Sequence, residues 1–285
     1  MRSSSEIFSL IVETAQADNR VRAVLLNGSR ANPLAKQDAF QDYDIVYVVN
    51  EMNSFLNDHS WIDVFGDRII LQMPDSMVIG NDSERENISF GYLMLFKDGN
   101  RIDLTLFPVD KLHTGFKKDS LTKVLLDKDD LFSHLPEPGI LDYLIQPPTQ
   151  KEFTDCCNEF WWVSTYVAKG LWRNEITYAK EMMESYVRPM FMRIIEWHTG
   201  YQNNFSVPFG KAGRHMKHYI SPGLYNDVLR TYADAQPENI WASLFTMTGL
   251  FKELTAGIVA YSGFAYDRQE EENVLNYLSR IKEME

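Results

Sequence analysis

The pattern of hydrophobic residues changes near residue 148, and this change limits the folds that a chain of 285 residues can adopt. Before it, short segments rich in β-branched and aromatic residues lie between Gly, Asp, Asn or Pro, as expected of strands. Prolines at positions 136, 138, 147 and 148 then interrupt the chain. Beyond them, apolar residues recur at helical spacing. The sequence therefore predicts an α+β protein with domains at residues 1–148 and 149–285.

In the first domain the spacing predicts one helix over residues 3–17, followed by strands. The pair Asp98–Gly99 lies between two of the predicted strands and is a strong hairpin signal. At least part of the sheet is therefore expected to be antiparallel. The predicted strands are 21–26, 45–49, 69–73, 90–96 and 102–107.

In the second domain a helix is expected to begin around Lys151, and Pro189 predicts a kink or break in a later helical segment. The first of these helices has two distinct faces. One face carries Phe153, Cys156, Cys157, Phe160, Ser164 and Val167, and the other carries Asp155, Glu159, Trp162, Tyr166, Lys169 and Arg173.

The charge of the chain restricts its partners. With 40 acidic and 28 basic residues the net charge is −12, which repels phosphate backbones and favours cationic partners. No run is long and apolar enough to span a bilayer. The only cysteines, Cys156 and Cys157, are adjacent, a spacing that favours a reducing compartment. We therefore expect a cytoplasmic protein that binds neither nucleic acid nor membranes, and nothing in the sequence implies a protein partner.

Two carboxylates lie two residues apart where one strand begins, in "QDYDIVYVV". Side chains alternate along a strand, so Asp42 and Asp44 project from the same face and can reach a common point. Carboxylate oxygens suit a hard cation, and Mg²⁺ completes its octahedron with waters and substrate phosphates. The pair therefore predicts a magnesium site that works with a nucleoside triphosphate.

A Gly-Ser-Arg turn ends the preceding strand and fits the same ligand. Gly28 lets the backbone approach a phosphate, the amide and hydroxyl of Ser29 can donate to it, and Arg30 adds positive charge. In "RIDLTLF", Asp103 projects from the face opposite Ile102 and Leu104. If this strand neighbours the strand of Asp44, Asp103 completes a carboxylate trio able to hold two ions.

The order of strand, Gly-Ser turn, D-x-D and later Asp resembles the nucleotidyltransferase superfamily that includes DNA polymerase β. The segments "QDYDIVYVV", "RIDLTLFP" and "YVAKGLWRNEITYAKEMME" extend a resemblance to the aminoglycoside 6-adenylyltransferases, the streptomycin-modifying enzymes, over almost the whole chain. The resemblance implies a mixed-sheet nucleotidyltransferase domain, a helical C-terminal domain and Mg²⁺-dependent transfer of AMP from ATP to a streptomycin hydroxyl. Its catalytic and metal-binding carboxylates match Asp42, Asp44 and Asp103, and its phosphate turn matches Gly28 and Ser29. Asp103 is the candidate general base.

The acceptor implied by this resemblance is a cationic aminoglycoside with two guanidinium groups. Its site should offer carboxylates and aromatic faces, as the helical stripe does, although the same stripe could be a solvent face that packs on a neighbouring helix. The candidate acceptor residues are Asp155, Glu159, Trp162 and Tyr166, and Lys169 and Lys180 are candidate triphosphate ligands or surface lysines.

Other functions fit parts of this pattern. A D-x-D also marks metal-dependent glycosyltransferases, which do not need the upstream Gly-Ser turn. The chain could instead adenylylate another small molecule or a protein, or be a ligand-binding module without catalysis. Intact Asp42, Asp44 and Asp103 argue against the last of these.

Overall fold

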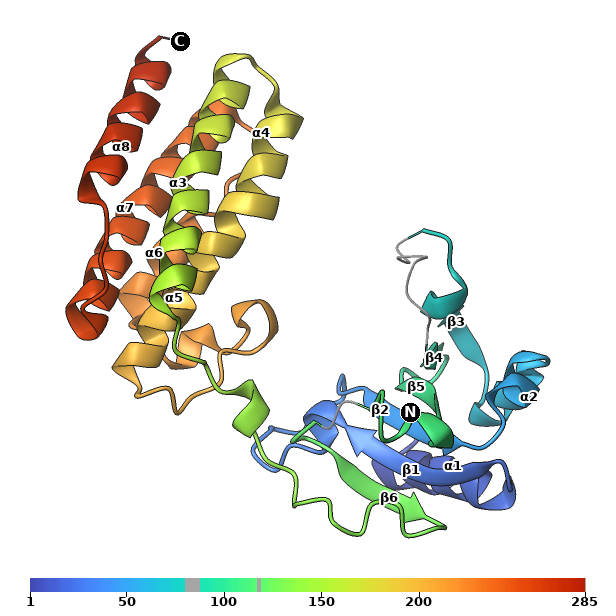
Figure 1. Ribbon diagram of the computed structural model, residues 1–285. Helices are drawn as coiled ribbons and strands as arrows, with labels where there is room; N and C mark the ends of the chain where they lie inside the picture. The colour runs from blue at the N-terminus through green and yellow to red at the C-terminus, as the bar shows by residue number, and fades with distance from the viewer. Residues whose placement is uncertain (80–87, 117–118, 285) are drawn as a thin grey trace. The chain divides into compact units, whose positions relative to one another are not determined.

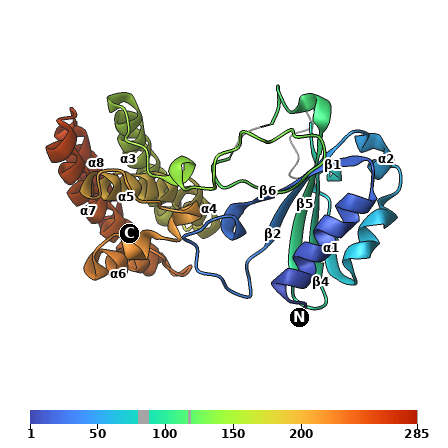
Figure 2. The ribbon, with the colours of Figure 1, turned by 90° about the horizontal axis from the view of Figure 1, so that it is seen from below.

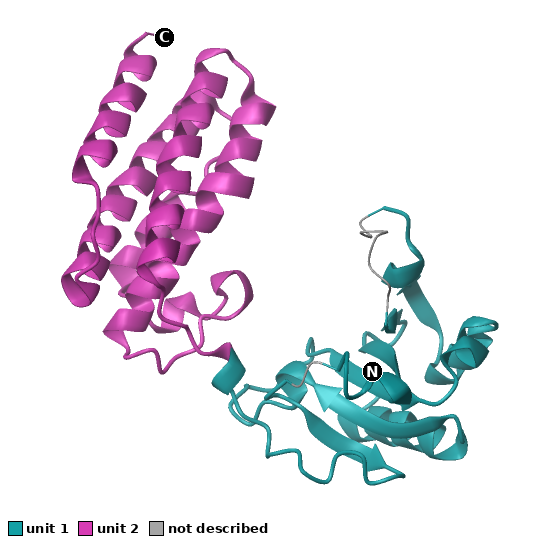
Figure 3. Cartoon of the chain, viewed as in Figure 1, with its two compact units in different colours: residues 1–142 teal, residues 143–285 magenta. Residues whose placement is uncertain are grey.

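The computed structural model describes residues 1–79, 88–116 and 119–284. The chain divides into two compact units, residues 1–142 and 143–285 (Figure 3). This division falls a few residues before the boundary expected at 148, within the proline-containing segment. None of the described helices combines the length and the apolar character needed to cross a membrane.

The described part of unit 1 forms a six-stranded mixed sheet with the strand order β3-β4-β5-β2-β1-β6 (Figure 1). Only β2 and β5 run parallel, and every other neighbouring pair is antiparallel. The strands are β1 Val21–Asn27, β2 Tyr43–Val49, β3 Arg68–Gln72, β4 Phe90–Phe96, β5 Arg101–Pro108 and β6 Lys123–Asp127.

The two faces of this sheet differ in what covers them. Helices α1 (Ser4–Ala17) and α2 (Met52–Leu56) lie on the same side of the sheet (Figure 2), where Ile7, Ile45 and Leu104 belong to one buried apolar cluster. The opposite face buries a smaller cluster that includes Val46 and Phe107. Because side chains alternate, Asp44 and Asp103 project from this second face.

Most of the predicted elements of unit 1 are confirmed. The first helix is α1, with Ser3 and Glu6 forming a capping box, and the five predicted strands are β1 to β5. The Asp98–Gly99 hairpin joins β4 to β5, with Gly99 at a φ of +85°. Strand β6 was not predicted, and it pairs with β1 at an edge of the sheet.

Unit 2 is helical, and its described residues contribute no strand to the sheet. Its long helix begins at Gln150, behind a capping box formed by Thr149 and Glu152. The rings of Phe160 and Phe251 stack in the core, with centroids 3.6 Å apart. The helices are α3 Gln150–Trp172, α4 Ile176–Met182, α5 Arg188–Gln202, α6 Pro222–Arg230, α7 Pro237–Ser262 and α8 Arg268–Glu283.

The predicted interruption at Pro189 takes the form of a π-helical turn, Met183–Val187, between α4 and α5. Proline has no amide hydrogen and its ring clashes with the preceding turn of an α-helix. A wider turn just before Pro189 accommodates both effects. The face of α3 that carries Phe153 and Phe160 is buried in the core, and both cysteines on it are buried and free.

Candidate active site

The Gly-Ser turn forms a short 3₁₀ turn, Gly28–Arg30, directly after β1. Gly28 has a φ of +69°, and a Cβ at this position would lie 2.2 Å from Oδ2 of Asp44. Both observations exclude a side chain here. The turn and the second carboxylate of the D-x-D are therefore in direct contact, which is the arrangement that a phosphate turn beside a metal site requires.

Ser29 lies in this turn with a half-buried side chain. Its carbonyl oxygen accepts a hydrogen bond of 3.5 Å from Nε2 of Gln41, whereas no described residue hydrogen-bonds to its hydroxyl. The hydroxyl is thus available to an incoming ligand. Its assignment to a phosphate stays a prediction.

The guanidinium of Arg30 has contacts that the sequence did not reveal. It donates to the carbonyl oxygens of Gln41, at 2.8 Å, and Asp42, at 3.1 Å. It also stacks 3.8 Å from the ring centroid of Tyr43. Arg30 therefore fixes the main chain that leads into β2 and carries the first carboxylate. A direct phosphate contact by Arg30 stays a prediction.

The three carboxylates come from neighbouring strands. Asp44 of β2 is the register partner of Asp103 in the parallel strand β5. The strand of Asp103 is therefore the neighbour of the strand of Asp44, which the predicted carboxylate trio requires. Asp42 lies one residue before β2 begins. Burial raises the pKa of Asp44 to about 6, and the charges of Asp103 and Asp42 add to this rise. Burial also raises the pKa of Asp42. Clustered negative charge of this kind favours a bound cation.

Arg101 contacts this trio and was not predicted. Its Nε and Nη2 each lie 2.7 Å from an oxygen of Asp103, and its Nε lies 3.8 Å from Oδ1 of Asp42. The spacing Arg-x-Asp in a strand was the available signal, because it places both side chains on one face.

The carboxylates fit a divalent cation by charge and by donor atom, and Asp44 and Asp103 share one face of the sheet. As the side chains stand, no three acidic, His or Cys groups among the described residues lie close enough together to hold one ion. The trio would therefore have to draw together, and Asp103 would have to change its contacts with Arg101, to share a cation.

The predicted acceptor stripe on α3 divides into two parts. Asp155 and Glu159 line a hollow of about 710 Å³ within unit 2. Trp162 and Tyr166 are not among its lining residues. They contact each other instead, with Nε1 of Trp162 donating to the Tyr166 hydroxyl at 2.8 Å.

The hollow is acidic. Asp155 pairs with Lys151 on its own helix, whereas Glu159 has no hydrogen-bond or ion-pair partner among the residues that the structure describes. Glu196 of α5 also lines the hollow, 3.7 Å from Arg193, and burial raises its pKa. Sequence reasoning missed Glu196, because only the packing of α5 beside α3 brings it there. The charged lining residues are Glu152, Asp155, Glu159, Glu196 and Arg193.

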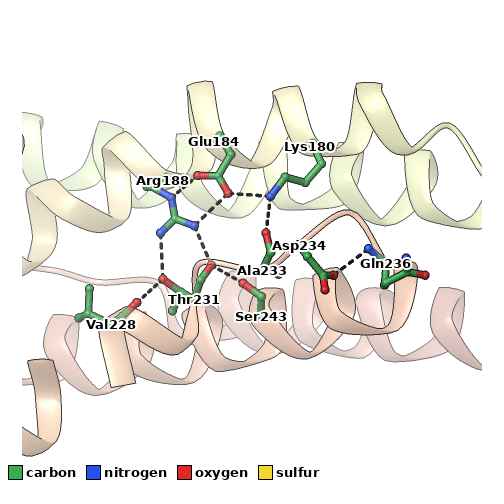
Figure 4. Close-up of polar contacts among 9 residues, drawn as sticks. All are labelled: Lys180, Glu184, Arg188, Val228, Thr231, Ala233, Asp234, Gln236 and Ser243. Carbon is green, nitrogen blue, oxygen red and sulfur yellow. Dashed lines mark hydrogen bonds and ion pairs between the residues drawn. The ribbon is translucent and has the colours of Figure 1, made fainter. Parts of the chain in front are cut away.

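The two candidate triphosphate lysines are both engaged within unit 2. Nζ of Lys180 donates to the carbonyl oxygen of Ala233 at 2.8 Å and lies 3.4 Å from Glu184 (Figure 4). Glu184 also pairs with Arg188, which donates to both oxygens of Thr231. This network fixes the segment between α6 and α7. Nζ of Lys169 lies 4.8 Å from the ring centroid of Tyr166. The assignment of either lysine to a triphosphate stays a prediction.

Comparison with known proteins gives matches over nearly the whole chain. The family model described as streptomycin adenylyltransferase matches residues 1–281. An aminoglycoside 6-adenylyltransferase of Bacillus subtilis (strain 168) is 40% identical over 283 residues, which are 99% of this chain and 98% of that protein. One from Campylobacter jejuni is 39% identical over 282 residues, covering 99% and 96% of the two chains.

Among solved structures, a crystal structure of an aminoglycoside 6-adenyltransferase from Bacillus subtilis is 35% identical, covers 99% of both chains and superposes with a TM-score of 0.48. The family match and the identity to full-length relatives are sufficient to assign the family. The chain belongs to the aminoglycoside 6-adenylyltransferases, the streptomycin adenylyltransferase family of enzymes.

Proposed function

We propose that this chain transfers AMP from ATP to a hydroxyl of streptomycin, the 6-hydroxyl according to the name of its relatives, and so inactivates the antibiotic. The family match supports the donor and the acceptor. The observation that carries the chemistry is the register of Asp44 against Asp103 beside Gly28. This arrangement joins a phosphate turn to paired carboxylates, and the transfer of a nucleotidyl group needs both.

In unit 1, we assign the triphosphate to the turn. The amide and hydroxyl of Ser29 donate hydrogen bonds to phosphate oxygens, and Gly28 lets the main chain come close to them. Arg30 acts indirectly, by donating hydrogen bonds to the carbonyl oxygens of Gln41 and Asp42. These bonds hold the first carboxylate at a fixed distance from the turn.

Asp42, Asp44 and Asp103 would hold Mg²⁺, with two ions expected. When bound, the ions neutralise the triphosphate and make the acceptor hydroxyl more acidic. The acceptor oxygen attacks the α-phosphorus, the bond from that phosphorus to the β-phosphate oxygen breaks, and pyrophosphate leaves. Asp103 accepts the hydroxyl proton.

In unit 2, we assign the cationic acceptor to the acidic hollow. A guanidinium group binds a carboxylate through two parallel hydrogen bonds, and Glu159 offers a carboxylate that has no partner among the described residues. Glu196 supplies a second, partly buried carboxylate. Their positions in one hollow favour an acceptor that carries more than one positive charge.

The test is release of pyrophosphate from ATP and Mg²⁺ in the presence of streptomycin. We expect release to depend on streptomycin and to be almost lost in Asp42→Asn and in Asp44→Asn, because an amide is a much poorer ligand for Mg²⁺. Asp67→Asn is the matched control, since the Asp67 side chain is 81% exposed and its one ion pair among the described residues is with the surface residue Lys97. Half of the wild-type rate in either site variant would contradict the metal assignment.

A further inference from the structure

The Arg101 side chain lies on the face of the sheet that carries Asp44 and Asp103, and it forms an ion pair with Asp103. It stands two residues before Asp103 in β5, so both side chains project from the same face. Nε and Nη2 of its guanidinium donate hydrogen bonds to the two carboxylate oxygens of Asp103, each at 2.7 Å. Its Nε is also within 3.8 Å of Asp42.

Among the described residues, Arg101 is the cation that forms ion pairs with members of this trio. The other nearby guanidinium, that of Arg30, donates to main-chain carbonyl oxygens and stacks on Tyr43. Among the described residues, the ion pairs that involve Asp42 and Asp103 are both formed with Arg101.

A metal ion and this guanidinium compete for the oxygens of Asp103. Mg²⁺ binds carboxylate oxygen at about 2.0–2.1 Å, and the guanidinium already holds both oxygens at hydrogen-bond distance. Two cations on one carboxylate repel each other strongly at such separations. Arg101 has space to leave, because its side chain is 43% exposed and lines a hollow of about 570 Å³ beside Leu93 and Leu95.

We propose that Arg101 competes with the divalent cation for the carboxylate of Asp103. It holds Asp103 in position beside β2 and gives up the carboxylate when the cation enters. Arg101 is thus a positioning residue that weakens the binding of the free metal ion. This inference rests on the proposed metal site at Asp42, Asp44 and Asp103.

The test is titration of the full chain with Mn²⁺ alone, followed by isothermal calorimetry and by the electron paramagnetic resonance signal of free Mn²⁺. We expect Arg101→Gln to bind Mn²⁺ about three- to tenfold more tightly than the wild type. Arg101→Lys keeps the charge but loses the two parallel bonds, and we expect about twofold or greater tightening.

Arg22→Gln is the matched control, because Arg22 forms a similar two-bond pair with Asp129 elsewhere in unit 1. Its Mn²⁺ affinity should equal that of the wild type. A second readout is the melting temperature. Adding Mn²⁺ to protein in metal-free buffer should raise it more in Arg101→Gln than in the wild type.

Unchanged or weaker Mn²⁺ binding by Arg101→Gln would overturn the proposal. Mn²⁺ affinity equal to that of the wild type in Arg101→Lys would also overturn it, since loss of charge alone would then explain the glutamine variant. Equal tightening of Mn²⁺ binding in Arg22→Gln would overturn it as well. Mn²⁺ binding by the wild type and by Asp44→Asn tests the metal site itself. If the wild type binds no Mn²⁺, or if Asp44→Asn binds it as well as the wild type does, the proposed metal site fails and the competitor role fails with it.

Discussion

Replacing Asp44 by Asn should stabilise the metal-free protein above pH 6. Burial, with the charges of Asp103 and Asp42, raises the pKa of Asp44 from 3.8 to about 6. A pKa difference of 1 corresponds to about 1.4 kcal/mol, so keeping this carboxylate ionised costs the fold at most about 3 kcal/mol. Solvent reaches part of the side chain, and we therefore expect a gain of about 1–3 kcal/mol in the variant.

The pH dependence follows from the direction of the change. Because the pKa of Asp44 is raised on folding, the folded protein binds this proton more readily than the unfolded chain between about pH 4 and pH 6. Lowering the pH through this window removes the cost, whereas above pH 6 the full cost remains. The advantage of Asp44→Asn should therefore be greatest at pH 8 and fall to about one third of that value at pH 4.5.

Thermal unfolding in excess EDTA measures this difference. A gain of about 1–3 kcal/mol should raise the melting temperature by roughly 3 to 9 °C at pH 8. Asp67→Asn removes one exposed carboxylate of unit 1 and should shift the melting temperature by less than about 1.5 °C. A melting temperature of Asp44→Asn at or below that of the wild type at pH 8, or a gain at pH 4.5 as large as the gain at pH 8, would refute the reasoning.

Three further predictions concern the two substrates and the cation. Ser29→Ala removes a hydrogen bond to a charged phosphate, worth about 1.5–3 kcal/mol, so kcat/KM for ATP should fall by about 10- to 100-fold; unchanged ATP kinetics would remove Ser29 from the site. Glu159→Gln should raise KM for streptomycin by about 10- to 100-fold while KM for ATP stays constant. Trp162→Ala should raise KM for streptomycin by less than about threefold, because Trp162 does not line the hollow. A larger effect in Trp162→Ala than in Glu159→Gln would place the acceptor elsewhere. Excess EDTA should abolish turnover and added Mg²⁺ should restore it, and turnover that survives EDTA would contradict the metal assignment.

Much of the fold could be predicted because local patterns and tertiary packing agree. The alternation in β2 and β5 sends one set of side chains to the α1 face, and sends a second set, which includes Asp44 and Asp103, to the other face. Strand β6 escaped prediction because Lys123–Asp127 is short and none of its side chains is fully buried. An edge strand of this kind is specified by its pairing with β1 rather than by its own pattern.

The residues that the sequence suggests for the candidate site are the turn, the carboxylates beside it and Asp103, and the structure brings Asp44 and Asp103 into register. Gly28 begins the turn, Asp42 directly precedes β2 and Asp44 lies in β2. The contacts of Arg30 with Gln41 and Asp42 depend on how the intervening loop folds back, which no periodicity encodes. Glu196 reaches the acidic hollow only through helix packing.

Mass spectrometry of the acceptor tests the central proposal most directly. Purified protein is incubated with ATP, Mg²⁺ and a panel of aminoglycosides, and in parallel with a UDP-sugar in place of ATP and with cell lysate as a source of protein acceptors. We expect streptomycin to gain the mass of one adenylyl group, with fragment ions that place it on the 6-hydroxyl, and we expect no product from Asp42→Asn or Asp44→Asn. Unmodified streptomycin, a transferred sugar, or adenylylation confined to proteins would contradict the proposed function.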